Sequence, residues 1–289
     1  MTSPFAYALC AMLFFGCADI VYKRAASAGV LPHHLLMVQS WVFLTSVTLY
    51  GLLTATLAFV SGSLWGACAG LFMWIGFHNF AHSLKSGAVS VNAPIFRLSF
   101  VITAALAIVL LKEPLTIGKI LGIALAGTSV WLLLAAPDRP APATRLREHP
   151  RQSRSSLRRV FIATAAVGIG NLLYKYGLRA GATPASLVVT QALVVVTGST
   201  GFACVTDRGI RPSTVALRYA PLAAVLLAAA FALLVESLSR GDASTMVPLS
   251  QMGLAVSAIA GFLLLGERLS LRKATGLAAA LAALASFLR

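Results

Sequence analysis

The sequence has few acidic residues and few charged residues of any kind. It carries 8 Asp and Glu against 23 Lys and Arg in 289 residues, and charged residues make up only 11% of the chain. With 58% hydrophobic residues, this composition excludes a sizeable soluble domain. The formal net charge of +15 does not predict nucleic-acid binding either, because the basic residues lie between apolar runs rather than on one hydrophilic face.

Motifs that would indicate catalysis, a metal or a cleaved leader are also missing. No GxxxxGK[ST] loop is present, so the sequence offers no site for ATP hydrolysis. No basic residue precedes the first apolar run, and Asp19 and Lys23 interrupt it where a signal-peptide cleavage site would lie. We therefore expect no catalytic residue, no resident metal and no cofactor. Four cysteines, which we interpret as packing residues, lack CxxC or metal-ligand spacing: Cys10, Cys17, Cys68 and Cys204.

Long apolar runs fill most of the chain. A helix needs about 20 mostly apolar residues to cross a bilayer, and ten such windows fit along the sequence. We predict an all-α membrane protein with ten transmembrane helices. Residues 137–158 are rich in proline, arginine and serine and are predicted to be a linker. The windows are 4–25, 35–57, 64–84, 89–111 and 117–135, then 159–179, 186–206, 216–239, 245–265 and 271–288.

The segments before and after the linker resemble each other. Eight residues of the first half recur at an offset of 152, and eight more at an offset of 154. Because each half has five predicted spans, an odd number, the second half enters the membrane in the opposite direction. This predicts two inverted five-helix repeats, residues 1–136 and 159–289, with a shared site near the midplane. Recurring pairs include Gly16 and Gly168, Tyr22 and Tyr174, Lys23 and Lys175, Pro32 and Pro184, Leu35 and Leu187, Gln39 and Gln191, Pro94 and Pro248, and Lys119 and Lys273.

Each half ends in an apolar helix with a proline, an acidic turn and a final apolar helix. We interpret the acidic residue of each turn as a cap or brace of the next helix. The first copy runs from Pro94 through Lys112-Glu113-Pro114-Leu115-Thr116 to Gly122, and the second from Pro248 through Gly266-Glu267-Arg268-Leu269-Ser270 to Gly276.

This pattern resembles the EamA repeat of the drug/metabolite transporter superfamily, over almost the whole chain apart from the linker. The resemblance implies a secondary transporter and not an enzyme. It says almost nothing about the substrate, because the superfamily includes exporters of amino acids and other metabolites, nucleotide-sugar carriers and choline-type permeases.

The central candidates for substrate binding are Arg97 and Gln251. Arg97 lies about 12 Å along the fourth window, and Gln251 lies at a similar depth from the opposite face, so both are expected near the midplane. Pro94 and Pro248 precede them by three residues and are predicted to kink these helices. The guanidinium and the freed carbonyl groups would bind a carboxylate or phosphate. The alternative is a structural ion pair of Arg97 with Asp19.

Two symmetry-related sets of polar residues are predicted to line two vestibules. Their spacing of i, i+3 and i+4 places each set on one helix face. The alternative for the lysines, which lie near helix ends, is that they only reach to the interface. The predicted substrate contacts are Asp19, Tyr22, Lys23, Asn171, Tyr174, Lys175 and, in the fourth window, Asn92.

His78, His82 and Glu236 are predicted to serve in proton coupling or gating. Histidine and a partly desolvated carboxylate can titrate in a useful pH range. Two alternatives stay open. His78 and His82, at i and i+4, could chelate a metal, although no further ligand pattern accompanies them. His82 and Glu236 could also simply cap the interface, since both lie close to helix ends.

The distribution of basic residues predicts the orientation. Sixteen Lys and Arg fall on the linker side and six on the other, with Arg97 inside the membrane. This predicts a cytoplasmic linker and external termini, whereas ten-span relatives are usually drawn with cytoplasmic termini. We expect a multi-pass protein of a bacterial-type inner membrane, with anionic lipids near the linker. Gly118 and Gly122 form a GxxxG that allows close helix approach within the monomer or in a homodimer.

We predict a secondary transporter that moves a small polar organic solute, of the amino-acid or other metabolite type, by alternating access and as an exporter. The formally charged candidates sum to +1, which favours an anionic or zwitterionic solute. The first alternative is a flippase for lipids or lipid-linked substrates on the same fold. The others are a membrane-embedded enzyme, disfavoured because inversion sends His82 and Glu236 toward opposite faces, and a non-transporting sensor or assembly subunit.

Overall fold

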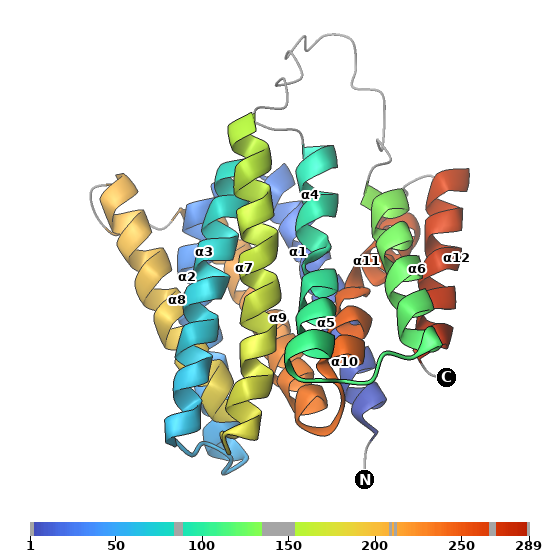
Figure 1. Cartoon of the computed structure of the whole chain (residues 1–289). Coiled ribbons are helices and arrows are strands. Elements are labelled where there is room, and N and C mark those ends of the chain that lie inside the picture. Colours follow the sequence, from blue (N-terminus) through green and yellow to red (C-terminus); the bar gives the residue numbers. More distant parts are fainter. Residues whose placement is uncertain are drawn as a thin grey trace, which may run out of the picture.

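The computed structural model describes residues 3–83, 89–134, 154–207, 210, 213–265 and 270–287. These residues form α-helices and one short 3-10 helix, with no strand among them, which confirms the all-α prediction (Figure 1). Eight predicted windows correspond to one helix each, and the fourth and ninth correspond to two. The helices are α1 Pro4–Ser27, α2 Pro32–Leu53, α3 Leu64–Ser83, α4 Val89–Arg97, α5 Ser99–Leu110, α6 Ile117–Leu134, α7 Arg154–Arg179, α8 Pro184–Asp207, α9 Thr214–Arg240, α10 Ala243–Gln251, α11 Gly253–Leu265 and α12 Leu271–Phe287.

Hydropathy alone supports fewer crossings than the ten predicted. Within the described residues, seven helical segments are long and apolar enough to cross a membrane, and Ile117–Leu133 is a shorter apolar helix. Helix α3 is not among them, because His78, Asn79 and His82 lower the mean hydropathy of its second half. The findings therefore establish a multi-helix membrane architecture, and ten crossings remain a prediction.

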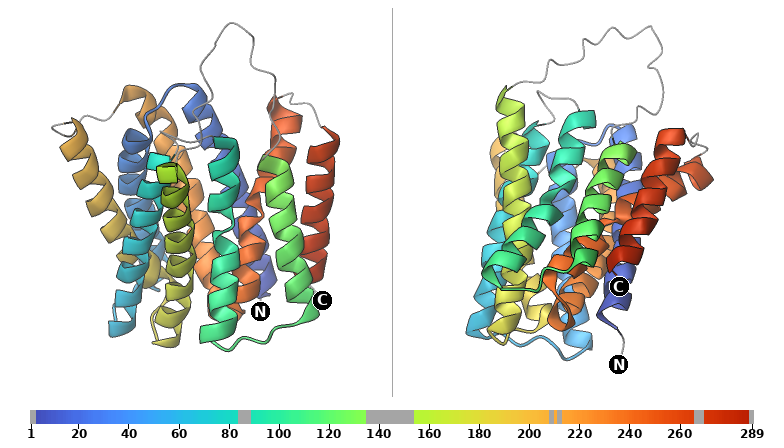
Figure 2. Two further views of the ribbon diagram at one scale, coloured as in Figure 1. Left: turned by 45° about the horizontal axis from the view of Figure 1, so that its top comes forward. Right: turned by 45° about the vertical axis from the view of Figure 1, so that its right-hand side comes forward.

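The helices of the two halves run in opposite directions. Helix α1 begins and α12 ends at one side of the molecule, which we call the terminus side (Figures 1 and 2). Helix α6 ends and α7 begins at the opposite side, which we call the linker side. Helix α1 thus runs toward the linker side and its repeat partner α7 runs away from it, as expected for an inverted repeat.

The fourth and ninth windows are interrupted at corresponding positions. Leu98 separates α4 from α5, and Met252, 154 residues later, separates α10 from α11. At each break the amide N–H bonds to the carbonyl three residues back, at 3.1 Å for Leu98 and 3.2 Å for Met252. Each break lies four residues after a helix proline, Pro94 or Pro248. The proline removes one donor from the helix, and the chain resumes a regular helix only after this tighter turn.

The halves also pack against each other through corresponding glycines. A Cβ on Gly16 of α1 would lie 2.6 Å from the carbonyl oxygen of Gly253 in α11, and one on Gly168 of α7 would lie 2.9 Å from that of Ser99 in α5. Such contacts are too short for any other residue, so glycine allows each helix backbone to approach the broken helix of the other half. The two crossings are related by the repeat, since Ser99 and Gly253 are 154 residues apart.

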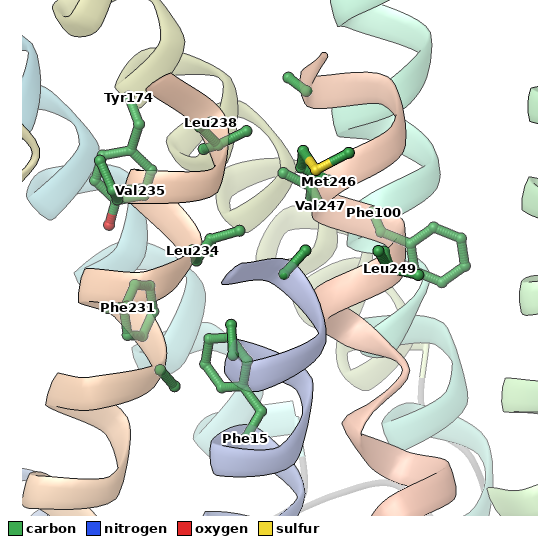
Figure 3. Packing of buried hydrophobic residues seen from close by; sticks show 14 of the residues in the cluster. Phe15, Phe100, Tyr174, Phe231, Leu234, Val235, Leu238, Met246, Val247 and Leu249 are labelled. Atoms are coloured by element: carbon green, nitrogen blue, oxygen red, sulfur yellow. The ribbon is translucent and has the colours of Figure 1, made fainter. Parts of the chain in front are cut away.

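The core is continuous across the two halves. Phe15 of α1 and Phe43 of α2 both meet Phe231 of α9 edge-to-face, with ring centroids 5.3 and 5.8 Å apart. Helices α9 and α10 carry further buried side chains of this core, including Leu234 and Leu249 (Figure 3). In a bilayer such packing, rather than exclusion of water, holds helices together.

Candidate functional site

Arg97 forms an ion pair with Asp19. The guanidinium ends α4, next to the helix break, and its Nη2 lies 2.5 Å from Oδ1 of Asp19 on α1. The two side chains are 24% and 17% exposed, so the pair is largely but not completely buried. The second carboxylate oxygen of Asp19 is buried and has no hydrogen-bond partner in the described part of the chain. The ion pair weighed as an alternative is therefore formed in this conformation, with one acceptor left over.

The corresponding position in the second half holds two neutral amides. Asn171 on α7 is only 1% exposed, and neither its Nδ2 nor its Oδ1 has a partner among the described residues. Gln251 ends α10, as Arg97 ends α4, and is half-buried. A buried amide without partners costs about 1–3 kcal/mol, so this position is expected to take a water or a polar ligand group.

A tyrosine and a glutamine join the first two helices of each half. The Tyr22 hydroxyl donates to Oε1 of Gln39 at 2.5 Å. The Tyr174 hydroxyl donates to Oε1 of Gln191 in the same way. Tyr22 is half-buried, but Tyr174 is completely buried, so in this conformation its hydroxyl does not reach a vestibule. The repeated bond supports the equivalence of the halves and gives both tyrosines a structural partner.

The two predicted vestibule lysines have different surroundings. Lys23 is exposed close to the end of α1. Lys175 is half-buried, and its Nζ donates to the carbonyl oxygens of Leu238 and Gly241 at 2.7 Å each. These carbonyls belong to the end of α9, where a cation is stabilised by the helix dipole. Lys175 thus holds the end of α9 in this conformation and does not face a vestibule.

Asn92 also has structural partners. Its side chain is completely buried. Nδ2 donates to the carbonyl and hydroxyl oxygens of Ser83 and to the hydroxyl of Ser156, at 2.9 to 3.2 Å. Asn92 therefore connects α4 to the end of α3 and the start of α7, and the structure gives it no access to a substrate in this conformation.

Corresponding residues of the two halves differ in exposure, and always in the same direction. Because the repeat is inverted, a residue near the linker side in one half corresponds to a residue near the terminus side in the other. In every recurring pair that differs in burial class among the described side chains, the member nearer the linker side is more exposed. These pairs are Tyr22 and Tyr174, Lys23 and Lys175, Pro32 and Pro184, Leu35 and Leu187, Gln39 and Gln191, and Lys273 and Lys119, with the linker-side member first.

Bonds between the halves join them on the terminus side. The buried carboxylate of Glu113, in the turn after α5, accepts the backbone N–H groups of Ala243 and Ser244 at 2.8 Å each. Lys119 Nζ lies 2.7 Å from Oδ2 of Asp242. Glu113 thus caps α10 of the other half rather than the next helix in the chain, because the free N–H groups of α10 lie within its reach. Its counterpart Glu267 lies outside the described residues.

A cavity of about 350 Å³ lies on the terminus side beside Lys119 and Asp242. Its walls come from α1, α6, α10 and α12 and include Phe5 and Phe287. Tyr174, Lys175 and Gln191 are not part of its lining, and the corresponding Tyr22, Lys23 and Gln39 likewise do not line the cavity on the linker side.

On the linker side, α2, α3 and α8 enclose a cavity of about 330 Å³. His78 and His82 of α3 both line it, as does Phe202 of α8, whose ring centroid lies 4.5 Å from that of His78. Its other polar and aromatic lining residues are His33, Trp74, Phe77 and Ser199. The sequence prediction named the two α3 histidines but not these residues or Phe202. A usable signal was that His33 and His34 directly precede the second window, so four of the five histidines lie in or next to the second and third windows.

The third predicted gating residue lies elsewhere. Glu236, near the end of α9 on the terminus side, pairs with Arg240 at 2.5 Å. The structure therefore does not bring Glu236 to His78 and His82, and the arrangement agrees with the expectation that inversion separates them.

These observations define a class: a multi-pass membrane protein built from two like halves, with a broken helix in each half and one cavity on each side. Comparison with known proteins gives the family. The model of the EamA-like transporter family matches residues 2–135 and 157–289, so the chain belongs to this family, as its resemblance had implied. It is accordingly an integral membrane protein with a general role in transport.

No curated protein matches the sequence. Among solved structures 29 chains match. One, described as "Crystal structure of protein", aligns with a TM-score of 0.79 at 15% identity, covering 98% of this chain and 95% of the other. At this identity the match establishes the fold over nearly the whole chain and carries no information on substrate.

Proposed function

We propose that this protein moves a small organic solute across the membrane by alternating access, with all ten windows crossing the bilayer as two inverted repeats. The observation that carries the proposal is the one-directional difference in exposure between corresponding residues. An inverted repeat can exchange the environments of its halves and thereby open to the other side. In this proposal the conformation described here opens toward the linker side, and the bonds of Glu113 and Lys119 hold the halves together at the terminus side.

The proposed substrate site is centred on Arg97, Asp19, Asn171 and Gln251. One carboxylate oxygen of Asp19 and both side-chain polar atoms of Asn171 have no partner in the described residues, so these positions have hydrogen-bonding capacity for a solute. A guanidinium that is bonded to only one carboxylate oxygen has further N–H groups that can donate to an anionic group of the solute. An anionic or zwitterionic solute, such as an amino acid, fits this set best.

We infer that the direction is export. With the linker side cytoplasmic, as the 16 basic residues on that side favour, the open side of this conformation faces the cytoplasm and would load a solute there. His78 and His82 line the open cavity. Imidazole titrates near pH 6.5, so these two residues are the proposed proton-coupling groups, whereas Glu236 is a candidate for the opposite side.

A second candidate function is movement of a lipid or another amphipathic molecule. The observation that favours it is the lining of the linker-side cavity, which is mostly apolar and includes Leu31, Leu36, Phe77 and Val195. Such a wall suits the apolar part of a substrate better than a fully hydrated solute.

The test uses the purified chain in proteoliposomes, preloaded with radiolabelled amino acids in one set and containing fluorescent lipid in another. Release of an amino acid that R97Q abolishes supports the proposed transporter. The matched control is R240Q, because Arg240 also pairs with a carboxylate but lies at the end of α9 on the terminus side. Equal release by R97Q and the unchanged protein would refute the central site. Lipid movement without solute release would favour the second candidate.

A further inference from the structure

Three polar side chains meet at the rim of the linker-side cavity. His33 and His34 lie in the first turn of α2, and Asp207 is the last residue of α8. Nε2 of His33 lies 3.2 Å from Oδ1 of Asp207, and Nε2 of His34 lies 2.9 Å from Oδ2. The carboxylate therefore lies between two imidazoles, and the cluster joins a helix of the first half to a helix of the second.

The donor set and its spacing fit a divalent transition-metal ion. The three potential ligand atoms all lie within 4.8 Å of one another. Tetrahedral Zn²⁺ with bonds of about 2.0–2.2 Å places its ligand atoms about 3.3 Å apart. The two histidine–aspartate distances, 3.2 Å to Oδ1 and 2.9 Å to Oδ2, are close to this value, so small movements of the three side chains would form the site. Two histidines and one carboxylate form a known zinc ligand set, with a fourth position for water.

Burial and charge support the same assignment. The three side chains are 13–20% exposed, so an ion can reach them but loses most of its contact with bulk water. With neutral imidazoles the cluster carries one negative charge, from Asp207. Nδ1 of His34 is buried and has no hydrogen-bond partner in the described part of the molecule. A buried polar atom without a partner requires an explanation. A rotation of the His34 ring on metal binding would give Nδ1 a partner.

We propose that His33, His34 and Asp207 bind one Zn²⁺-class ion, which fastens α2 to α8 at the rim of the linker-side cavity. The repeat gives the terminus side no such site, because Ala185 and Ser186 occupy the positions that correspond to the two histidines. If the proposed transport function holds, the bound ion stabilises the linker-side-open conformation and slows turnover. The binding itself does not depend on that function.

Binding is tested with the full chain in detergent, purified through a tag that contains no histidine. Titration with ZnCl₂ is followed by calorimetry, and titration with CoCl₂ by visible absorption. We expect one equivalent of Zn²⁺ and a tetrahedral Co²⁺ spectrum. D207N and H33Q/H34Q should each weaken binding by more than the roughly 10- to 100-fold that follows loss of an outer-shell partner. D207E, which keeps the carboxylate, should bind more tightly than D207N.

Two matched controls make the test specific. H78Q/H82Q removes two histidines of the same cavity, and D242N removes an aspartate at the other side. Both should bind Zn²⁺ like the unchanged protein. Absence of stoichiometric binding, or loss of binding in H78Q/H82Q with retention in D207N, overturns the proposal. In proteoliposomes, Zn²⁺ should reduce solute release by the unchanged protein but not by D207N. Zn²⁺ binding without any solute release would refute the transport function and leave the metal site standing.

Discussion

The two halves of the chain share a repeat but place different chemistry at its centre. The first half meets the middle of the molecule with the charged pair Asp19 and Arg97, 2.5 Å apart. The second half has Asn171 and Gln251 at the corresponding positions, and the Asn171 amide has no partner among the described residues. The charged pair is satisfied largely within the protein, whereas the neutral position retains unused donors and acceptors. The comparison indicates that the first half contributes a charged pair, whereas the second half contributes an amide with unused hydrogen-bonding groups.

The halves differ in burial as well. Tyr174 is completely buried while Tyr22 is not, although each makes the same bond to a glutamine. A molecule with identical halves in identical environments would show equal burial. The proposed alternating access accounts for the difference, because it opens the molecule to one side at a time.

The largest expected effect comes from removing one charge of the central pair. R97Q leaves Asp19 ionised and unpaired, which should lower the free energy of unfolding by about 3 kcal/mol, the lower end of the range for fully buried pairs. D19N/R97Q recreates the amides of the second half and should recover most of that stability but not transport. Unfolding in detergent and solute release measure the two effects. Full recovery of transport by the double variant would show that the charge is not needed.

The next effect should come from the glycines that bring the halves together. G16A and G168A place a Cβ 2.6 and 2.9 Å from backbone oxygens of the opposite half, and relief of such overlap costs about 1–3 kcal/mol. Both should lower the midpoint of thermal unfolding. G201A is the control, because nothing described lies within 4 Å of its Cβ, and it should be neutral or stabilising. Tolerance of both core substitutions would contradict the close crossing of the halves.

A smaller effect is expected on the terminus side. E113Q weakens two charge-assisted bonds to the first amides of α10, with a cost of about 1–2 kcal/mol. It should also raise the accessibility of a cysteine introduced at Ser244 to a water-soluble thiol reagent in a background without native cysteines. E236Q, at the half-buried partner of Arg240 on the same side, is the control and should not change the accessibility of the cysteine introduced at Ser244. No change in E113Q would argue that this bond does not keep the terminus side shut.

The smallest effect directly compares the halves. Y174F leaves buried Gln191 without its donor and should cost about 1 kcal/mol or more, whereas Y22F should cost roughly half as much or less, because water can replace the lost bond at Gln39. Chemical unfolding of the two variants measures the difference. Equal costs would indicate that the two environments are alike in solution and that the asymmetry does not persist there.

Much of the architecture could be predicted from the sequence, because apolar windows and recurring residues are visible in it. The position of the helix breaks was less accessible. Pro94 and Pro248 lie near breaks, but Pro221 lies inside the uninterrupted α9. A proline alone therefore does not determine where a helix breaks. At both breaks a glycine of the other half lies against the first residue after the break, Gly16 at Gly253 and Gly168 at Ser99, and this contact is not visible in the local sequence.

The candidate site was predicted only in part. The sequence placed Arg97, Asp19 and the α3 histidines within the membrane, but it could not show that Lys175 and Asn92 would be held by carbonyl and hydroxyl groups of other helices. It also missed the cluster of His33, His34 and Asp207. The two histidines lie more than 170 residues before the aspartate in the chain. Their proximity results from the packing of α2 against α8 and leaves no local signal.

By itself, the sequence determined a helical membrane protein with two related halves, because the bilayer demands long apolar helices and the recurring residues are visible in the chain. The tertiary structure decided which polar groups are satisfied and which side chains line the cavities. That decision depends on contacts between helices far apart in the chain, and an inverted repeat admits two such sets of contacts for one sequence.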